Sequence, residues 1–407
     1  MSLQIAIIGG GAAGFFSAIH IAERLPNANV TIYEGSNKVL AKVLVSGGGR
    51  CNVTNRISDP TDLVKNYPRG HDFLTPVFEK FSSTDTQAWF TLRGVPLKTE
   101  EDGRVFPTSD SSLSIYNCLT QTASQLGVTV NKGQRLTDFS HNSEQWHLHF
   151  GNEKVLADIL VLATGSNPAI YDLLKDKVNI VAPVPSLFTF KATNHALVEL
   201  SGISVENGTV KIAQINTSGE SGPLLITHKG YSGPAILRLS AWHARELAEL
   251  NYKCTLYINW GSYNTKELAA LLKSYAESRP KEKVTHWKEH GLPKRLWQHI
   301  FEKCELREFT NWSELGKKGI AKILQQLCSY AVPVEGKNTF KEEFVTAGGI
   351  DLAEVDAPSM HVKNHPNLYA AGEVLNIDAI TGGFNFQAAW SEAYCLAEAI
   401  AQQEQNV

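Results

Sequence analysis

The sequence lacks the features of secreted, membrane-spanning and metal-binding proteins. Its 407 residues include only six cysteines, none of which forms a CxxC pair, so neither a disulfide framework nor a zinc site is indicated. The N-terminus lacks the basic and then apolar order of a signal peptide, and no apolar run approaches the length of a membrane span. The formal net charge of -3 favours neither nucleic acid nor an anionic membrane. We therefore expect a cytoplasmic protein with reduced thiols, no bound metal, and no nucleic-acid or membrane partner.

The most informative motif is a glycine-rich turn after the first apolar run. Ile5–Gly14 reads IAIIGGGAAG and is followed by a helical stretch, a second β-like run and Glu34. This order predicts a dinucleotide-binding βαβ unit, in which Gly9 allows a sharp turn, Gly11 allows close approach to a pyrophosphate, and Gly14 allows tight helix packing. The N–H groups at the start of the helix would face the phosphates. Glu34 would accept hydrogen bonds from a ribose and repel a 2′-phosphate, which favours FAD or NAD over NADP.

Further along the chain, β-like and helical patterns alternate. A Gly/Asn-rich loop covers Ser46–Asn55, and Asp72–Leu92 has a helical pattern. Val128–Val130 and Trp146–Phe150 read as strands, and Asp158–Gly165 reads as a buried parallel strand that ends in a small-residue turn. Residues 1–186 are therefore predicted to form the first part of a dinucleotide-binding domain.

The pattern changes after Pro185. Residues 187–262, together with 330–342, read as short strands of an inserted β-barrel-like subdomain, and residues 263–329 read as an inserted helical subdomain. Strand-and-glycine segments return in residues 343–407, which are predicted to complete the first domain. The predicted fold class is α/β, with a Rossmann-like FAD-binding domain interrupted by these two subdomains.

Three segments far apart in the chain favour FAD over NAD. The first is the N-terminal fingerprint, the second is Ala163–Gly165 at a strand end, and the third is Tyr369–Glu373 followed by Thr381–Ala389. An acid after a strand-ending glycine can hold ribityl hydroxyls or, through water, a phosphate. Phe384–Phe386 would start the final helix, and their N–H groups would point at the flavin N1/C2 carbonyl region. There they would stabilise the negative charge that develops on the flavin when it is reduced. A simple NAD dehydrogenase has no need of this terminal element.

Five longer motifs lie along the chain: SGGGRCNVTN at Ser46–Asn55, GRVFPTS at Gly103–Ser109, THKGYSGPAIL at Thr227–Leu237, TAGGID at Thr346–Asp351 and AAGEVLNIDAITGGFNFQAA at Ala370–Ala389. In these motifs the chain resembles the HI0933-like flavoprotein family over nearly its whole length. Members of that family are described as NAD(P)/FAD-dependent oxidoreductases or aminoacetone-oxidase-family enzymes. The resemblance implies noncovalently bound FAD in a Rossmann-like domain, with an inserted β-barrel-like subdomain and a helical subdomain.

The resemblance also implies which residues lie along FAD. They are Gly9, Gly11, Gly14, Glu34, Lys42, Arg50, Cys51, Asn52, Leu136, Ala163, Thr164, Gly165, Gly372, Glu373, Gly383, Phe384 and Asn385. Neighbouring residues complete the predicted set, namely Ala12, Ala13, Gly35, Gly49 and Asp378. The sequence departs from the family pattern at Ala379, where a glycine often follows the aspartate, and at Glu392, which replaces a glycine on the last helix. The first departure would shift the loop near Asp378 slightly, and neither threatens the cofactor assignment.

No catalytic residue is assigned from the sequence. Arg50 is either a cation for the pyrophosphate or the reduced flavin, or a surface loop residue. Cys51 either faces the flavin or is a small buried residue, and no CxxC partner supports a redox disulfide. Asn52 either binds cofactor atoms or fixes the loop. His228, in the inserted region, either lines the substrate side or is a surface histidine.

The sequence is compatible with several functions. The leading hypothesis is an FAD-dependent oxidoreductase that transfers hydride to or from a small organic substrate. A second glycine fingerprint is missing, so NADH or NADPH is expected at most as a transient electron donor. One alternative is a small-amine oxidase that uses oxygen without a nicotinamide, and another is a redox sensor without turnover. A tRNA-modifying or nucleic-acid-binding flavoprotein is a different class, although glutamates offset the basic residues of Lys273–Arg307, which favours a solvated helical face.

Overall fold

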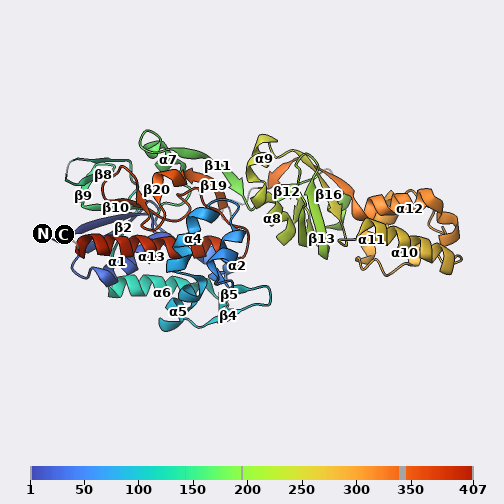
Figure 1. The fold of residues 1–407 in the computed structure, drawn as a ribbon, viewed down its shortest axis with the longest axis horizontal. Coiled ribbons are helices and arrows are strands. Elements are labelled where there is room, and N and C mark those ends of the chain that lie inside the picture. Colours follow the sequence, from blue (N-terminus) through green and yellow to red (C-terminus); the bar gives the residue numbers. More distant parts are fainter. Residues whose placement is uncertain (1, 143, 194–195, 339–344, 406–407) are drawn as a thin grey trace. The chain divides into compact units, whose positions relative to one another are not determined.

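The structure is a computed structural model that describes residues 2–142, 144–193, 196–338 and 345–405. The chain divides into two compact units, one of residues 1–184 with 341–407 and the other of residues 185–340 (Figure 1). The boundary predicted between residues 342 and 343, and Phe344 in the strand predicted there, lie outside the described residues.

The first unit is built on a seven-stranded sheet with the order β20-β21-β22-β10-β1-β2-β6. Its parallel strands are β22 (Leu368–Ala370), β10 (Ile159–Leu162), β1 (Gln4–Ile8), β2 (Asn29–Glu34) and β6 (Thr129–Lys132). Two short antiparallel strands, β21 (His361–Val362) and β20 (Val355–Asp356), extend one edge. The central strands consist mainly of buried Ile, Leu and Val, as expected of parallel strands that are covered on both faces. The predicted α/β class with a Rossmann-like domain is therefore confirmed.

Two long helices from opposite ends of the chain pack side by side in this unit (Figure 1). They are α1 (Ala12–Arg24) and α13 (Phe384–Gln405), and the rings of Phe16 and Trp390 meet between them at 5.0 Å. The other helices are α2 (Ala41–Gly49), α3 (Pro60–Leu63), α4 (His71–Lys80), α5 (Ser83–Leu92), α6 (Ser112–Gln125) and α7 (Pro168–Leu174). The predicted helical stretch Asp72–Leu92 is thus two helices, because Phe81 leaves the helical conformation and Ser82 starts α5 with a capping box.

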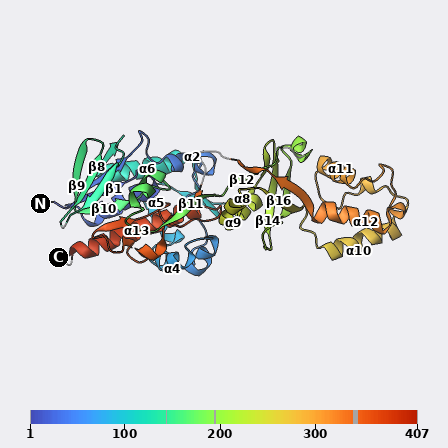
Figure 2. The same ribbon diagram turned by 90° about the horizontal axis from the view of Figure 1, so that it is seen from above.

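Smaller sheets complete the first unit. The antiparallel strands β7 (Asp138–His141), β8 (Trp146–Phe150) and β9 (Glu153–Ala157) lie beside β1 and β10 (Figure 2). A second small sheet has the order β3 (Thr54–Asn55), β5 (Arg104–Pro107) and β4 (Leu97–Thr99). The chain leaves this unit through β11 (Ile180–Ser186) and returns through β19 (Val345–Ile350), and these two strands pair with each other.

The second unit begins with a seven-stranded antiparallel sheet. In spatial order its strands are β17 (Tyr330–Val334), β16 (Cys254–Asn259), β13 (Ser204–Ile212), β14 (Glu220–Thr227), β15 (Gly230–Ser232), β12 (Thr189–Lys191) and β18 (Gly336–Asn338). The two edge strands, β17 and β18, are joined by Glu335 alone, so the sheet must curl to bring its edges together, as in a barrel. The helix α8 (Pro234–Trp242) packs against this sheet, and α9 (Ala244–Glu249) follows it.

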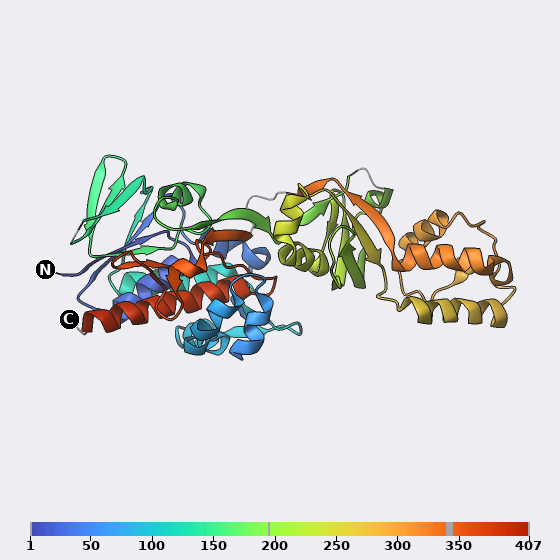
Figure 3. The ribbon, with the colours of Figure 1, turned by 45° about the horizontal axis from the view of Figure 1, so that its top comes forward.

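Three helices form a small subdomain of the second unit (Figure 3). They are α10 (Thr265–Ser278), α11 (Lys294–Lys303) and α12 (Trp312–Cys328), and they have an aromatic core of their own. Tyr275 stacks on Trp312 with ring centroids 5.2 Å apart, and Trp287 meets Trp297 edge-on at 5.4 Å. Across the described ranges, no helix is both long enough and apolar enough to cross a membrane.

Candidate functional site

The turn between β1 and α1 requires glycine at two positions and leaves space at a third. A Cβ atom on Gly9, whose φ is +112°, would lie 2.3 Å from the Ala163 carbonyl oxygen. A Cβ on Gly14 would lie 1.9 Å from the Gly9 carbonyl oxygen, whereas one on Gly11 would meet no atom of the described residues within 4 Å. Gly9 and Gly14 therefore allow β1, α1 and β10 to approach each other, and Gly11 faces open space that a ligand can enter.

The first turn of α1 presents amide groups toward this space. The first residue to donate a backbone hydrogen bond inside the helix is Phe15, which bonds the Gly11 oxygen at 3.0 Å. Gly11 supplies no side-chain cap, and the first turn contains no acidic residue. The N–H groups of Ala12, Ala13 and Gly14 and the positive end of the helix dipole therefore suit a phosphate.

Glu34 ends β2 and ties two loops together. Its Oε2 accepts a hydrogen bond from the Gly10 N–H and its Oε1 accepts one from the Ser36 N–H, each at 2.8 Å. A carboxylate has about four acceptor positions, so Glu34 retains the capacity to accept hydrogen bonds from ribose hydroxyls. The side chain lines a cavity at the strand ends, and five predicted residues meet there: Gly9, Glu34, Gly35, Leu136 and Thr164.

The loops after β10 and β22 converge on Glu373. A Cβ on Gly165 would lie 3.9 Å from the Oε2 atom of Glu373, and this oxygen also forms an ion pair with Lys42 of α2. The Oε1 atom accepts a hydrogen bond from the Thr346 N–H at 2.9 Å. The structure thus brings together predicted residues that are separated by more than three hundred positions in the chain.

The glycine-rich loop is held in a left-handed conformation and is bonded to the start of α13. Gly49 has a φ of +84° and Cys51 a φ of +60°, which is uncommon for a residue with a Cβ. Burial raises the pKa of the Cys51 thiol to about 12, so this thiol is protonated and unreactive at neutral pH. With its amide oriented to match its neighbours, Asn52 accepts a hydrogen bond from the Gly383 N–H at 2.9 Å and donates one to the Thr54 oxygen at 3.0 Å.

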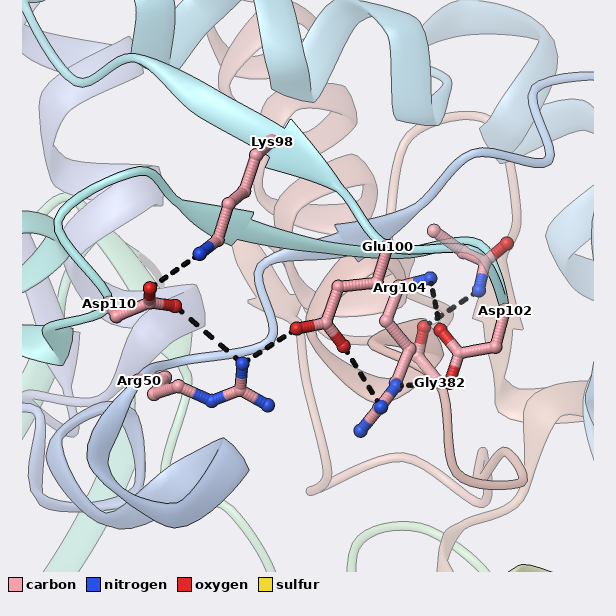
Figure 4. Close-up of polar contacts among 8 residues, drawn as sticks. Arg50, Lys98, Glu100, Asp102, Arg104, Asp110 and Gly382 are labelled. Carbon is pink, nitrogen blue, oxygen red and sulfur yellow. Dashed lines mark hydrogen bonds and ion pairs between the residues drawn. The ribbon is translucent and has the colours of Figure 1, made fainter.

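Arg50 lies in an ion-pair network beside this loop (Figure 4). Its Nη1 donates to Glu100 at 2.7 Å and lies 3.6 Å from Asp110, and its guanidinium stacks 4.0 Å above the Phe106 ring. Arg104 donates to the same Glu100 at 2.9 Å. The guanidinium of Arg50 is therefore engaged by carboxylates of the β4–β5 region, which the sequence did not predict.

The start of α13 presents a second set of amide groups. Gly383 has a φ of +87°, and a Cβ there would lie 2.5 Å from the Thr54 oxygen, so only glycine fits. The first residue inside the helix to donate a backbone hydrogen bond is Gln387, which bonds the Gly383 oxygen. The N–H groups of Phe384–Phe386, which start the helix, therefore precede its first internal hydrogen bond. The Asn385 side chain does not extend outward, because it exchanges two hydrogen bonds with the Ala379 backbone at 3.0 and 3.2 Å.

Asp378 is fully buried, and the Arg69 guanidinium binds its carboxylate through two nitrogen atoms. This pair ties the loop before α13 to the segment before α4. Sequence reasoning also missed Tyr67, whose hydroxyl donates to the Phe384 oxygen at 2.6 Å, and Gln387, which accepts from Thr86 at 2.9 Å. All of these partners lie about three hundred residues apart, and no local pattern marks them.

Among the residues with described positions, no catalytic acid or base stands out in this site. His228 lies in the exposed turn between β14 and β15 of the second unit. Within the part of the chain that the structure describes, no three His, Cys, Asp or Glu side chains are grouped to hold a metal ion. The open space at Gly11, the strand-end cavity and the two helix starts fit a dinucleotide whose second half is a flavin.

The fold and this site define a class of protein, the flavin-dependent oxidoreductases with one dinucleotide domain and an inserted second unit. The particular family follows from comparison with known sequences. The family model described as the HI0933-like protein Rossmann domain matches residues 3–399, and the chain belongs to this family of FAD-binding oxidoreductases. The predicted family is confirmed, whereas the individual FAD contacts stay predictions.

Two relatives are similar to the chain over its full length. The 3-dehydro-bile acid delta(4,6)-reductase of Clostridium scindens is 25% identical over 410 residues, which cover 98% of this chain and 99% of the relative. The ribosomal RNA dihydrouridine synthase of Haemophilus influenzae is 27% identical over 415 residues, which cover 98% of each chain.

Solved structures share the fold. A flavocytochrome c3 fumarate reductase in an open conformation has a TM-score of 0.53 at 14% identity, with 98% of this chain and 78% of that chain covered. The 3-ketosteroid delta1-dehydrogenase from Sterolibacterium denitrificans has a TM-score of 0.51 at 11% identity, with 99% and 100% covered.

Proposed function

We propose that the protein is an FAD-dependent reductase of a carbon–carbon double bond conjugated to a carbonyl group. The observation that carries the proposal is the pair of helix starts, α1 and α13, at the carboxyl ends of the parallel strands. The first suits a diphosphate and the second suits a ring carbonyl that gains negative charge. The names of the two full-length relatives support the choice of substrate group. A 3-oxo-Δ4,6 steroid and the uracil ring of uridine both contain such a double bond.

The chain's own residues would bind and orient the cofactor. The amides of Ala12, Ala13 and Gly14 would hold the diphosphate, Glu34 the ribose, and the amides of Phe384–Phe386 the ring. When bound, FAD supplies two-electron hydride chemistry. Reduction of the double bond adds one hydride and one proton, and the two electrons would come from NADH or NADPH. The nicotinamide would visit transiently, because the sequence has no second dinucleotide fingerprint.

Anaerobic stopped-flow absorbance near 450 nm tests the reaction. We expect NADH or NADPH to bleach the flavin, and an α,β-unsaturated carbonyl compound then to restore its colour without oxygen. A 3-oxo-Δ4 steroid acid and a uridine-containing RNA are the two probes. Bleaching by a small amine, with peroxide formed on re-aeration, would contradict the proposal and favour the amine oxidase.

A second, finer proposal is that the substrate is a uridine in RNA. Residues 185–340 contain 20 Lys and Arg but only 14 Glu and no Asp, so their formal net charge is +6. The rest of the chain has 18 basic and 27 acidic residues, so its formal net charge is -9. The whole-chain net charge of -3 conceals this asymmetry. Most of the excess lies in the α10–α12 subdomain, where residues 263–329 contain 13 Lys and Arg and 8 Glu. Segregated positive charge of this kind favours a polyanionic partner.

Binding of ribosomal RNA fragments at several salt concentrations tests the RNA proposal. Lys281 and Lys288 are exposed in the subdomain, and the double variant Lys281→Glu/Lys288→Glu is expected to weaken RNA binding about tenfold and to flatten its salt dependence. The matched control is Lys154→Glu/Lys175→Glu, which makes the same charge change on exposed residues of the first unit. Equal losses of RNA affinity in the two variants would indicate a non-specific charge effect and contradict the proposal.

A further inference from the structure

A buried carboxyl group lies behind the turn that follows β22. Glu392 of α13 is 0% exposed. Its Oε2 accepts a hydrogen bond from the Gly372 N–H, and its Oε1 has no hydrogen-bond partner among the described residues. Burial raises the pKa of Glu392 to about 8. The side chain therefore carries a proton at neutral pH.

Gly372 connects this carboxyl group to the candidate site. It has a φ of +82°, and a Cβ there would lie 3.0 Å from the Cβ of Ala13, so its backbone lies against the first turn of α1. The next residue is Glu373, which pairs with Lys42 and with the Thr346 N–H. The group that holds the Gly372 N–H therefore helps to fix the backbone beside the proposed diphosphate position.

Among the described residues, the titratable groups that interact electrostatically with Glu392 are themselves uncharged. They are Tyr67, from the segment before α4, and Cys395 on α13 itself. Burial raises the pKa of the tyrosine well above its usual value and that of the thiol to about 12, so both are neutral at physiological pH. Ionisation of Glu392 would therefore place a charge among neutral groups.

Among the described residues of the helices and strand packed against α13, the cations have partners of their own, and one is Arg24 of α1, which stacks 4.7 Å from the Tyr394 ring centroid and donates to the His20 oxygen at 3.0 Å. On α4, Lys80 pairs with Glu398 at 2.6 Å, and on α1, burial lowers the pKa of His20, so this imidazole is neutral. The elements α5 and β3 reach α13 through Thr86 and Thr54, which bond Gln387 and do not titrate. A buried charge without a partner is costly in a protein interior.

We propose that Glu392 is a positioning residue that makes FAD binding depend on pH. Its neutral carboxyl group holds the Gly372 backbone beside the cofactor diphosphate, and its ionisation puts a buried negative charge behind the same turn. Two negative charges repel each other strongly where little water separates them. FAD affinity therefore falls as the pH rises. This inference rests on FAD binding at the site proposed above.

Equilibrium release of FAD from the holoprotein, followed by flavin fluorescence between pH 6.5 and 9.5, tests the inference. The wild-type Kd is expected to rise on the order of tenfold across this range. Glu392→Gln keeps an acceptor for the Gly372 N–H but cannot ionise, so its Kd is expected to stay flat. The matched control is Glu398→Gln on the same helix, which should keep the wild-type profile.

The outcomes separate the two proposals. A wild-type Kd that does not change with pH, or a Glu392→Gln variant with the wild-type profile, would overturn the role of Glu392 alone. Absence of FAD binding at every pH would overturn the proposed function and this inference together. Should Glu392→Gln fail to fold, infrared spectra of the wild type give the answer. A protonated-carboxyl band that disappears in parallel with FAD release supports the inference, and its absence at pH 7 refutes it.

Discussion

At the residue scale, three glycines of one motif have different neighbours. A Cβ on Gly9 or Gly14 would overlap the backbone of the protein itself, whereas a Cβ on Gly11 would have no atom of the described residues within 4 Å. Gly11 is also extended, with φ at -90°, so any residue can adopt its conformation. The first two positions therefore serve the fold, and the third serves the ligand.

This difference leads to a prediction with an internal control. Gly11→Val is expected to fold with a Tm near that of the wild type but to purify without FAD, because the new side chain fills the space of the diphosphate. Gly14→Val is expected to lower the stability by several kcal/mol through overlap with the Gly9 carbonyl. Thermal unfolding and the flavin absorbance of the purified variants check both. A yellow Gly11→Val protein would show that FAD does not approach this turn.

Glu34 serves both the fold and the proposed ligand. Glu34→Ala is expected to raise the Kd for FAD on the order of tenfold and to lower the free energy of unfolding by about 1 kcal/mol, because the Gly10 and Ser36 N–H groups lose their acceptor. Glu34→Gln retains one acceptor and should recover most of the stability. Flavin titration and urea unfolding measure the two effects, and unchanged FAD affinity in both variants would exclude Glu34 from the ribose site.

At the element scale, the loop before α13 is fixed by a pair of side chains from distant parts of the chain. Asp378 is 0% exposed and Arg69 is 14% exposed, so the ion pair is largely shielded from water. Shielding makes the loss of one partner much more costly than the loss of both, because a single remaining charge has no compensation.

Arg69→Met is therefore expected to lower the free energy of unfolding by about 3–5 kcal/mol. The double variant Arg69→Met/Asp378→Leu should show a much smaller decrease in the free energy of unfolding, since neither charge remains buried. Urea unfolding followed by tryptophan fluorescence gives both values. Equal decreases in the free energy of unfolding of the single and double variants would mean that the pair contributes through packing alone.

The contrast between short-range and long-range patterns explains what the sequence could predict. The β1–α1–β2 unit was predictable because Gly9, Gly14 and Glu34 lie within one short segment with a characteristic spacing. The bond between Arg69 and Asp378 spans 309 positions, and the pairing of Arg50 with Glu100 depends on how β5 folds back beside the glycine-rich loop. One sequence contains no signal for such partners. The uneven charge of the two units could have been found by counting each segment separately.

At the scale of the whole molecule, the predicted FAD contacts all lie in the first unit, while the positive charge lies in the second. The α10–α12 subdomain has its own aromatic core, and the barrel-like sheet has its own buried strands. The second unit therefore has the internal contacts that a separate folding unit needs.

Calorimetry should accordingly resolve two unfolding transitions. FAD at about 100 times its Kd should stabilise only the first unit, by about 2.7 kcal/mol, because a ligand stabilises the unit that binds it. Gly11→Val should show both transitions and no shift of either with FAD. A single transition that shifts as a whole would mean that the two units unfold together.

The pairing of β11 with β19 has a consequence for the history of this protein. The chain departs and returns through two adjacent strands, so everything between them can be exchanged without changing the order of any strand in the parallel sheet. A recombination event at these two points would join a different second unit to an unchanged first unit. Selection can then act on the two parts independently, and a lineage can acquire new specificities while keeping its inherited chemistry.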